Sequence, residues 1–330
     1  MNAPEQIRIG IAGYGNLGRG VESAVQKNAD MTLVGVFSRR NPADLELQHP
    51  ETQGYSWSVL TEMRDQIDVL ILCGGSKDDL PVQGPELAAH FTTVDSFDTH
   101  ARIPEYFAEV DASASANQNT AIISVGWDPG LFSINRLFGE AILPDGESYT
   151  FWGKGLSQGH SDALRRVAGV AAGVQYTIPN ETAIDQVRSG SQPALSTREK
   201  HTRECYVVLE NGADAAQVRE TIVTMPNYFA EYDTTVHFIS AAEFASNHTK
   251  MPHGGFVIRS GNTSTHEGQV IEYALTLDSN PEFTASVLVA YARAAYRMQH
   301  SGNFGAKTVF DIAPGLLSPK SGGELRAQLL

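Results

Sequence analysis

Short apolar runs alternate with helical stretches in the first 127 residues. Five runs have the length and composition of buried strands: Ile7–Ala12, Thr32–Phe37, Asp68–Cys73, Phe91–Val94 and Thr120–Val125. Three stretches between them have helical character: Leu17–Lys27, Pro85–His90 and Tyr106–Ala116. Short apolar strands that alternate with helices are typical of a parallel sheet covered on both faces. We therefore predict an α/β fold with a Rossmann-type, doubly wound parallel sheet.

Beyond about Tyr149 the pattern changes to segments in which apolar and polar residues alternate. Four of them predict antiparallel strands: Glu204–Leu209, Thr234–Ile239, Gly255–Arg259 and Gln269–Leu277. A strongly amphipathic helix follows at Phe283–Gln299, and Pro281 and Glu282 suit its first turn. We predict a first domain over residues 1–127, a second α+β domain with a mainly antiparallel sheet over residues 128–280, and a segment over residues 281–330 that packs back on the first.

A glycine-rich turn, Gly13–Gly18, links the first strand to the first helix with the spacing GxGxxG. In this setting the glycines let the backbone approach a pyrophosphate, and the helix start supplies free N–H groups. An acid at the end of the second strand would bind the ribose of NAD, but this chain has Ser38, Arg39 and Arg40 there. Guanidinium groups suit the 2′-phosphate of NADP. The alternative is a glycine-rich surface turn, and the flanking strands and helix favour NADP binding.

Polar residues follow the carboxyl end of each predicted parallel strand, where ligands of such sheets bind. One rim should carry all of these segments: Gly13–Gly18, Ser38–Arg40, Gly74–Ser76, Ser96–Asp98 and Trp127–Asp128. Two carboxylates on this rim, Asp98 and Asp128, could bind a substrate ammonium, or one could act as a base. Helix capping or a local turn is the alternative for each.

Residues 151–162 are rich in glycine and polar groups, which predicts a binding loop. Within it, Trp152, like Trp127, flanks a glycine-rich turn and forms either part of the core or a wall around an aliphatic ligand. Asp162 is expected to cap a helix that starts near Ala163.

Three residues of the second half are candidates for ligand contacts. Arg203 could bind a carboxylate through its planar fork, or it could make a surface salt bridge. His253 is held in a turn by proline and glycine, and no Cys/His cluster accompanies it, so we predict no metal site. Asn280 is either a helix cap or a hydrogen-bond donor in a cleft.

The composition excludes several classes of protein. A net charge of −14 argues against binding to nucleic acid or to an anionic membrane surface. No stretch has the length of a membrane span, and the N-terminus lacks the apolar core of a signal peptide. Only Cys73 and Cys205 are present, which fits reduced, buried thiols in a cytoplasmic protein.

Four sets of residues carry a resemblance to a known family, and the long motifs in the middle of the chain are more specific than the glycine turn. The four sets are Gly13–Gly18 with Phe37–Arg40, Gly126–Gly130 running into Phe132–Arg136, Phe151–Gly153 with Gly155–Arg166, and Met251–Gly255. Together they resemble the meso-diaminopimelate dehydrogenase family over roughly Ile7 to Ser318. The resemblance implies reversible, NADP-dependent oxidative deamination of meso-2,6-diaminopimelate at its D-centre, with ammonia as a product. Because family members are generally homodimers, it also implies a homodimer.

The resemblance and the rim together imply two sets of contacts. The cofactor contacts are Gly13, Tyr14, Gly15, Asn16, Leu17, Gly18, Ser38, Arg39, Arg40, Gly74, Gly75, Ser76, Ser96, Phe97, Asp98, Gly126, Trp127, Asp128, Pro129 and Gly130. The substrate contacts are Asp98, Asp128, Trp152, Ser157, Gln158, Gly159, Thr177, Arg203, His253 and Asn280. Asp98 and Asp128 are the catalytic candidates, and either an Asp or a bound water would take the proton of the amine.

Three alternatives remain open from the sequence. Another NADP oxidoreductase of amino-acid metabolism, of the dihydrodipicolinate or homoserine type, would not account for the run from Phe151 to Arg166. A broader NADP-dependent D-amino-acid dehydrogenase differs only in its substrate range. A redox-inactive NADP-binding regulator would bind the cofactor without turnover.

Overall fold

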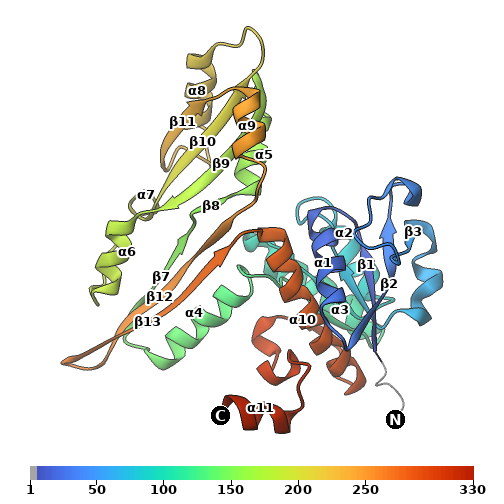
Figure 1. Cartoon of the computed structure of the whole chain (residues 1–330). Coiled ribbons are helices and arrows are strands. Elements are labelled where there is room, and N and C mark those ends of the chain that lie inside the picture. Colours follow the sequence, from blue (N-terminus) through green and yellow to red (C-terminus); the bar gives the residue numbers. More distant parts are fainter. Residues whose placement is uncertain (1–5) are drawn as a thin grey trace. The chain divides into compact units, whose positions relative to one another are not determined.

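The computed structural model describes residues 6–330, which divide into two compact units (Figure 1). Unit 1 comprises the residues up to Ile134 together with Pro281–Leu330, and unit 2 comprises Asn135–Asn280. Each unit has hydrophobic clusters of its own. None of the helices in the described part of the chain is long and apolar enough to cross a membrane.

Unit 1 is built on a sheet of seven parallel strands in the order β14-β6-β5-β4-β1-β2-β3. Its strands are β1 Ile7–Ala12, β2 Met31–Ser38, β3 Gly54–Ser56, β4 Val69–Leu72, β5 Thr93–Asp95, β6 Thr120–Ile122 and β14 Gly305–Lys307. Its helices are α1 Asn16–Gln26, α2 Leu80–Ala88, α3 Ile103–Ala116, α10 Asn280–His300 and α11 Gly322–Leu329, and α4 Leu131–Ile142 begins in it. The predicted Rossmann-type fold is confirmed.

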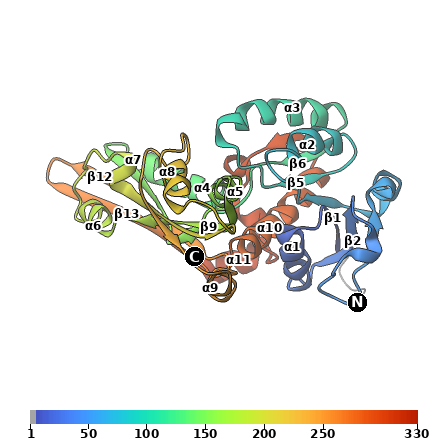
Figure 2. The same cartoon turned by 90° about the horizontal axis from the view of Figure 1, so that it is seen from above.

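Apolar residues on both faces of the sheet hold these helices in place. Ile9 and Ile11 of β1 pack in one cluster with α1 and α10, whereas Leu70 and Leu72 of β4 pack in the other with α2 and α3. Figure 2 shows the two pairs of helices on opposite sides of the sheet. Because successive side chains of a strand point to opposite faces, an entirely apolar strand serves both clusters.

Several predicted boundaries in unit 1 are wrong, including the start of α3, which lies at Ile103 rather than at Tyr106. Helix α2 starts at Leu80 rather than at Pro85, because Pro81 occupies its first turn, where a missing N–H costs nothing. Strand β6 ends at Ile122 rather than at Val125, and Ser124 then adopts a left-handed conformation with φ of 56°.

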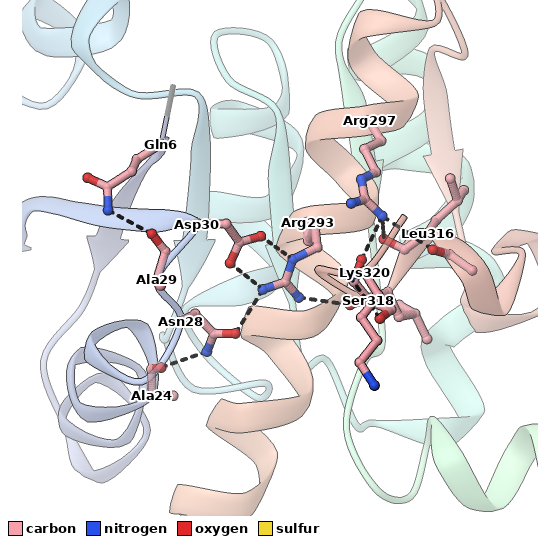
Figure 3. Close-up of polar contacts among 12 residues, drawn as sticks. Gln6, Ala24, Asn28, Ala29, Asp30, Arg293, Arg297, Leu316, Ser318 and Lys320 are labelled. Carbon is pink, nitrogen blue, oxygen red and sulfur yellow. Dashed lines mark hydrogen bonds and ion pairs between the residues drawn. The ribbon is translucent and has the colours of Figure 1, made fainter. Parts of the chain in front are cut away.

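A buried arginine on α10 fastens the C-terminal segment to unit 1 (Figure 3). Arg293 is 2% exposed and donates from Nε and Nη2 to the Asp30 carboxylate at 2.5 and 2.7 Å. It also donates to Asn28 Oδ1 and to the Leu317 carbonyl, both at 2.8 Å. One guanidinium therefore joins α10, the chain before β2 and the segment that follows β14.

Unit 2 contains two sheets rather than the single one expected. The first has the order β11-β10-β9-β8 and the second β13-β12-β7. The strands are β7 Gly146–Trp152, β8 Gly155–Leu156, β9 Val170–Pro179, β10 His201–Leu209, β11 Asp233–Phe238, β12 His253–Ser264 and β13 Glu267–Leu277. The helices are α5 Gln158–Arg165, α6 Glu181–Arg188, α7 Thr197–Lys200, α8 Ala215–Val223 and α9 Ala241–Asn247.

Two predictions for unit 2 need correction. Strands β10 and β11 are parallel, not antiparallel, because α8 lies between them and makes the crossover that parallel strands require. Helix α5 begins at Gln158 after Ser157, so Asp162 lies inside the helix instead of capping it. Its carboxylate pairs with Arg165 one turn further on.

Candidate active site

The glycine turn after β1 borders open space at Gly15 and is closely packed at Gly18. Gly13 has a φ of 96°, a backbone conformation that would be strained in a residue with a side chain. A Cβ on Gly18 would lie 2.4 Å from the Gly13 carbonyl oxygen, so the start of α1 packs directly against the turn. A Cβ on Gly15 would meet nothing within 4 Å, so this part of the turn faces open space.

A cleft of about 390 Å³ lies at the carboxyl ends of β1, β2 and β4. Eight of its lining residues were predicted as cofactor contacts: Gly13, Tyr14, Gly15, Asn16, Ser38, Arg39, Arg40 and Gly74. Five further lining residues were not predicted as cofactor contacts: Arg19, Trp57, Cys73, Asp79 and Gln83. Three guanidinium groups therefore border one cleft, which suits an anion such as a phosphate.

The arginines of the cleft are held by neighbouring polar groups. The Arg40 guanidinium donates to the Tyr14 carbonyl of the glycine turn, and its amide donates to Ser38 Oγ at 3.1 Å. Arg39 Nη2 lies 2.8 Å from Oδ1 of Asp79, whose other oxygen accepts from the Gly75 amide. The Ser-Arg-Arg segment is therefore oriented toward the glycine turn and toward the start of α2.

A buried carboxylate on α1 binds the side chain of Tyr14 in the glycine turn. Glu22 is fully buried, and it accepts hydrogen bonds from the Tyr14 hydroxyl and from the amides of Gln48 and His49. Burial favours the neutral acid, but these hydrogen bonds outweigh it and lower the pKa of Glu22. Sequence reasoning missed this residue, and its only signal was an acid on the buried face of an amphipathic helix.

The turns after β5 and β6 carry the two predicted catalytic acids. Asp98 is exposed, and its amide donates to Oγ of Ser76 at 3.2 Å, which ties this turn to the one after β4. Asp128 is half-buried in a tight turn in which a Cβ on Gly130 would overlap the Gly126 carbonyl. Trp127 is 7% exposed and packs edge-on against Phe132, so it belongs to the core of unit 1.

In unit 2 the strand register aligns several of the predicted substrate residues. Thr177 of β9 lies opposite Gly155 of β8 on one side and Arg203 of β10 on the other. Arg203 is only 6% exposed, lies 3.9 Å from the centre of the Tyr232 ring and donates to Thr177 Oγ1. Among residues 6–330 it has no ion pair, so the surface salt bridge considered from the sequence is wrong.

The hydroxyl group of Thr177 has a proton that it can donate to a ligand. Its Oγ1 accepts from Arg203 and from Nε2 of Gln175, the latter at 3.4 Å. Gln175 is fully buried and was not predicted. Because a hydroxyl has two lone pairs and one proton, the proton of Thr177 is left to donate elsewhere.

Two histidines near Arg203 are neutral at physiological pH. Burial, with Arg203 as the second cause, lowers the pKa of His160 to about 4 and that of His201 to about 3. Nε2 of His201 accepts from the Trp152 amide at 2.8 Å, and the two rings stack. The charge of Arg203 is therefore the only cationic side-chain charge among these groups.

The turn before β12 lies beside the same residues. A Cβ on Gly155 would come within 2.5 Å of His253, which is 8% exposed. Gln158 Nε2 lies 3.5 Å from Sδ of Met251, and the Met251 carbonyl accepts from the Asn280 amide at 2.9 Å. Ser157 directly precedes α5, and its hydroxyl shares a hydrogen bond with His160 instead of capping the helix, while Gly159 faces open space.

A Rossmann-type unit with a cleft bordered by three guanidinium groups, in a chain that also holds a buried arginine without an ion pair among residues 6–330, is typical of a nucleotide-dependent dehydrogenase of a charged substrate. Residues 126–279 match the family model described as the diaminopimelic acid dehydrogenase C-terminal domain. A meso-diaminopimelate D-dehydrogenase of Ureibacillus thermosphaericus is 62% identical over 332 residues, which cover 98% of this chain and 99% of the relative. The chain belongs to the meso-diaminopimelate D-dehydrogenase family.

Solved structures agree with this assignment. A diaminopimelate dehydrogenase of Corynebacterium glutamicum in complex with diaminopimelate is 46% identical, with a TM-score of 0.92 over 98% of this chain and 99% of that one. An engineered D-amino acid dehydrogenase bound to NADP+ is 44% identical, with a TM-score of 0.87 over 98% of this chain and 100% of that one.

Proposed function

We propose that the protein catalyses the NADP-dependent oxidative deamination of meso-2,6-diaminopimelate at its D-centre. The products are L-2-amino-6-oxopimelate, which cyclises to tetrahydrodipicolinate, together with ammonia and NADPH. The observation that carries the proposal is Arg203, a buried guanidinium without a carboxylate partner among residues 6–330, in a member of this family. A substrate with a carboxylate at each end supplies the missing anion.

The residues of unit 1 fit NADP. Gly15 leaves open space beside the start of α1, where a pyrophosphate would accept backbone N–H bonds. Arg39 and Arg40 border the same cleft as Ser38, and their forks would bind the 2′-phosphate. Bound NADP supplies the chemistry of the reaction, because its nicotinamide ring takes up the hydride.

Asp98 and Asp128 would hold the reacting ammonium at the rim of unit 1. The ammonium must lose a proton before the C–H bond breaks, and one of these carboxylates or a bound water would take it. Loss of this proton from nitrogen and of a hydride from the same centre leaves an imine, which adds water and releases ammonia. Ser96, Phe97 and the turn of residues 126–130 would complete the cofactor contacts on this rim.

Unit 2 would hold the distal end of the substrate. Arg203 and the Thr177 hydroxyl would donate to the distal carboxylate, with His253 beside them. Trp152 is 36% exposed and would cover the aliphatic chain. The remaining contacts proposed for the substrate are Ser157, Gln158, Gly159 and Asn280.

The reaction assay separates this proposal from its alternatives. NADPH formation is measured with meso-, L,L- and D,D-diaminopimelate and with simple D-amino acids, each with NADP and with NAD. We expect turnover of the meso isomer with NADP, much less with the L,L isomer and less with NAD. Equal rates with short D-amino acids would indicate the broader D-amino-acid dehydrogenase, and cofactor binding without turnover would indicate a regulator.

We also propose that the protein is a homodimer that acts in the cytoplasm, in lysine and diaminopimelate biosynthesis. Unit 2 exposes several large apolar side chains, including Phe138, Ile142, Val270 and Ile271, and β13 forms one edge of its sheet. Exposed apolar groups of this kind are typical of protein interfaces. Light scattering would give about twice the chain mass of 35.7 kDa for a dimer.

A further inference from the structure

Asp95 is a buried carboxylate at the end of β5 that accepts hydrogen bonds from three groups of the protein. It is 1% exposed. Its Oδ1 accepts from the amides of Phe97 and Ser124 at 2.9 and 3.0 Å, and its Oδ2 accepts from the Tyr106 hydroxyl at 2.6 Å. Two of these donors belong to the backbone of different turns, one after β5 and one after β6.

The carboxylate joins the two turns where the sheet no longer does. Strands β5 and β6 pair only at Thr93 with Ala121 and at Val94 with Ile122. Beyond these pairs, the Asp95 carbonyl accepts from the Val125 amide at 2.9 Å, and its side chain binds the amide of Ser124. Beyond the last paired residues of β5 and β6, hydrogen bonds to Asp95 therefore connect the two segments.

The residue that donates this contact, Ser124, has an uncommon backbone conformation. Its φ of 56° is uncommon for a residue other than glycine and needs surrounding bonds to maintain it. The left-handed residue turns the chain from β6 toward the segment that carries Asp128. On the other side, the Phe97 amide that Asp95 binds lies directly before Asp98.

We infer that Asp95 is a positioning residue that fixes the turn of Asp98 relative to the turn of Asp128. The inference rests on the proposed function, which assigns both acids to the reacting ammonium. Tyr106 holds the second carboxylate oxygen, and burial, with the Asp95 charge as the second cause, raises its pKa, so that it remains a donor. Neither Asp95 nor Tyr106 lines the cofactor cleft.

The test compares Asp95→Asn with Asp30→Asn, which makes the same chemical change in the same unit. Asp30 precedes the amino end of β2, so its ion pair with Arg293 lies at the end of the sheet opposite the rim. For Asp95→Asn we expect kcat for diaminopimelate oxidation to fall at least about tenfold, because small misplacements of reacting groups are costly. NADP affinity should fall by a smaller factor than kcat, since the guanidinium-bordered cleft at β1, β2 and β4, which Asp95 does not line, is retained.

An isotope effect distinguishes positioning from general destabilisation. With substrate deuterated at the D-centre, the effect on kcat should increase in Asp95→Asn, because hydride transfer becomes slower relative to product release. Asp30→Asn should lower Tm and leave kcat and the isotope effect unchanged. Tyr106→Phe removes one of the three hydrogen bonds to Asp95 and should cause an intermediate loss of kcat. We expect this variant to fold, so it provides the test even if Asp95→Asn does not fold.

Two outcomes overturn the inference. One is a kcat within twofold of the parent in folded Asp95→Asn or, where that variant does not fold, in Tyr106→Phe. The other is an equal loss of kcat in Asp30→Asn at the same loss of Tm. A parent protein that binds NADP but does not oxidise diaminopimelate contradicts the proposed function instead, and the inference falls with it.

Discussion

Replacing Arg203 by Met tests the distal end of the proposed substrate site. Arg203 is buried between the Thr177 hydroxyl and the face of Tyr232. Methionine keeps much of the aliphatic stem and its packing, but it removes the charge and the hydrogen-bond fork. Arg203→Lys is the matched control, because lysine keeps the charge and loses the fork.

The expected magnitude follows from the number of donors lost. One Nη of Arg203 already donates to Thr177, and its Nε has no hydrogen-bond partner among residues 6–330. A hydrogen bond to a charged group contributes about 1.5–3 kcal/mol, so losing the contact to a distal carboxylate costs about 3 kcal/mol. At about 1.4 kcal/mol per tenfold, affinity for diaminopimelate should fall roughly 100-fold.

The assay is steady-state NADPH formation together with direct titration of the cofactor. For Arg203→Met we expect a much higher KM for meso-diaminopimelate and an unchanged NADP affinity. Any turnover of a short D-amino acid, which lacks the second carboxylate, should not decrease. Arg203→Lys should be intermediate. A parallel loss of NADP affinity, or an equal loss with the short substrate, would refute the placement of Arg203 at the distal carboxylate.

Two further predictions concern unit 1. Removing Arg39 and Arg40 together by substitution with Ala should narrow the preference for NADP over NAD in kcat/KM, because the 2′-phosphate loses its guanidinium partners; an unchanged ratio would contradict this. Hydrogen bonds from Arg293 lower the pKa of Asp30 below 3.8, so the pair stabilises the fold above that pH and the stabilisation disappears as pH falls through the lowered pKa. Urea unfolding should therefore show a stability gap between the parent and Asp30→Asn that closes below about pH 4.

The features predicted correctly from the sequence depend on local patterns. No knowledge of tertiary contacts is needed to recognise the apolar runs of β1 and β4 or the spacing of the glycine turn. The position of the Ser-Arg-Arg segment at the end of β2 could be predicted from its place in the chain alone. Motif matches over the second half then identified the family.

The features that sequence reasoning missed depend on contacts between distant segments. Strand β14 pairs with β6 only after the chain has passed through unit 2 and α10. The roles of Glu22 and Asp95 require knowledge of which backbone amides surround a buried acid. The parallel pairing of β10 with β11 depends on α8, a helix that the alternating pattern on either side does not reveal.

The environment of Arg203 also links the site to the stability of the fold. Burial disfavours its charged form and lowers its pKa, and no carboxylate within residues 6–330 compensates the charge. His160 and His201 avoid further repulsion because they are neutral. Because removing a charge from water carries a desolvation penalty, replacing this guanidinium by an apolar side chain of similar volume removes a destabilising contribution.

Arg203→Met should therefore raise the Tm of the ligand-free protein and should reduce the further increase in Tm that the same concentration of diaminopimelate gives the parent. Thermal unfolding with and without diaminopimelate measures both effects, and Arg203→Lys, which keeps the buried charge, should not show the increase. If ligand-free Arg203→Met is less stable than the parent, the contacts with Thr177 and Tyr232 outweigh the cost of burying the charge. In that case the guanidinium serves the fold, and the argument that it is kept for a substrate carboxylate is wrong.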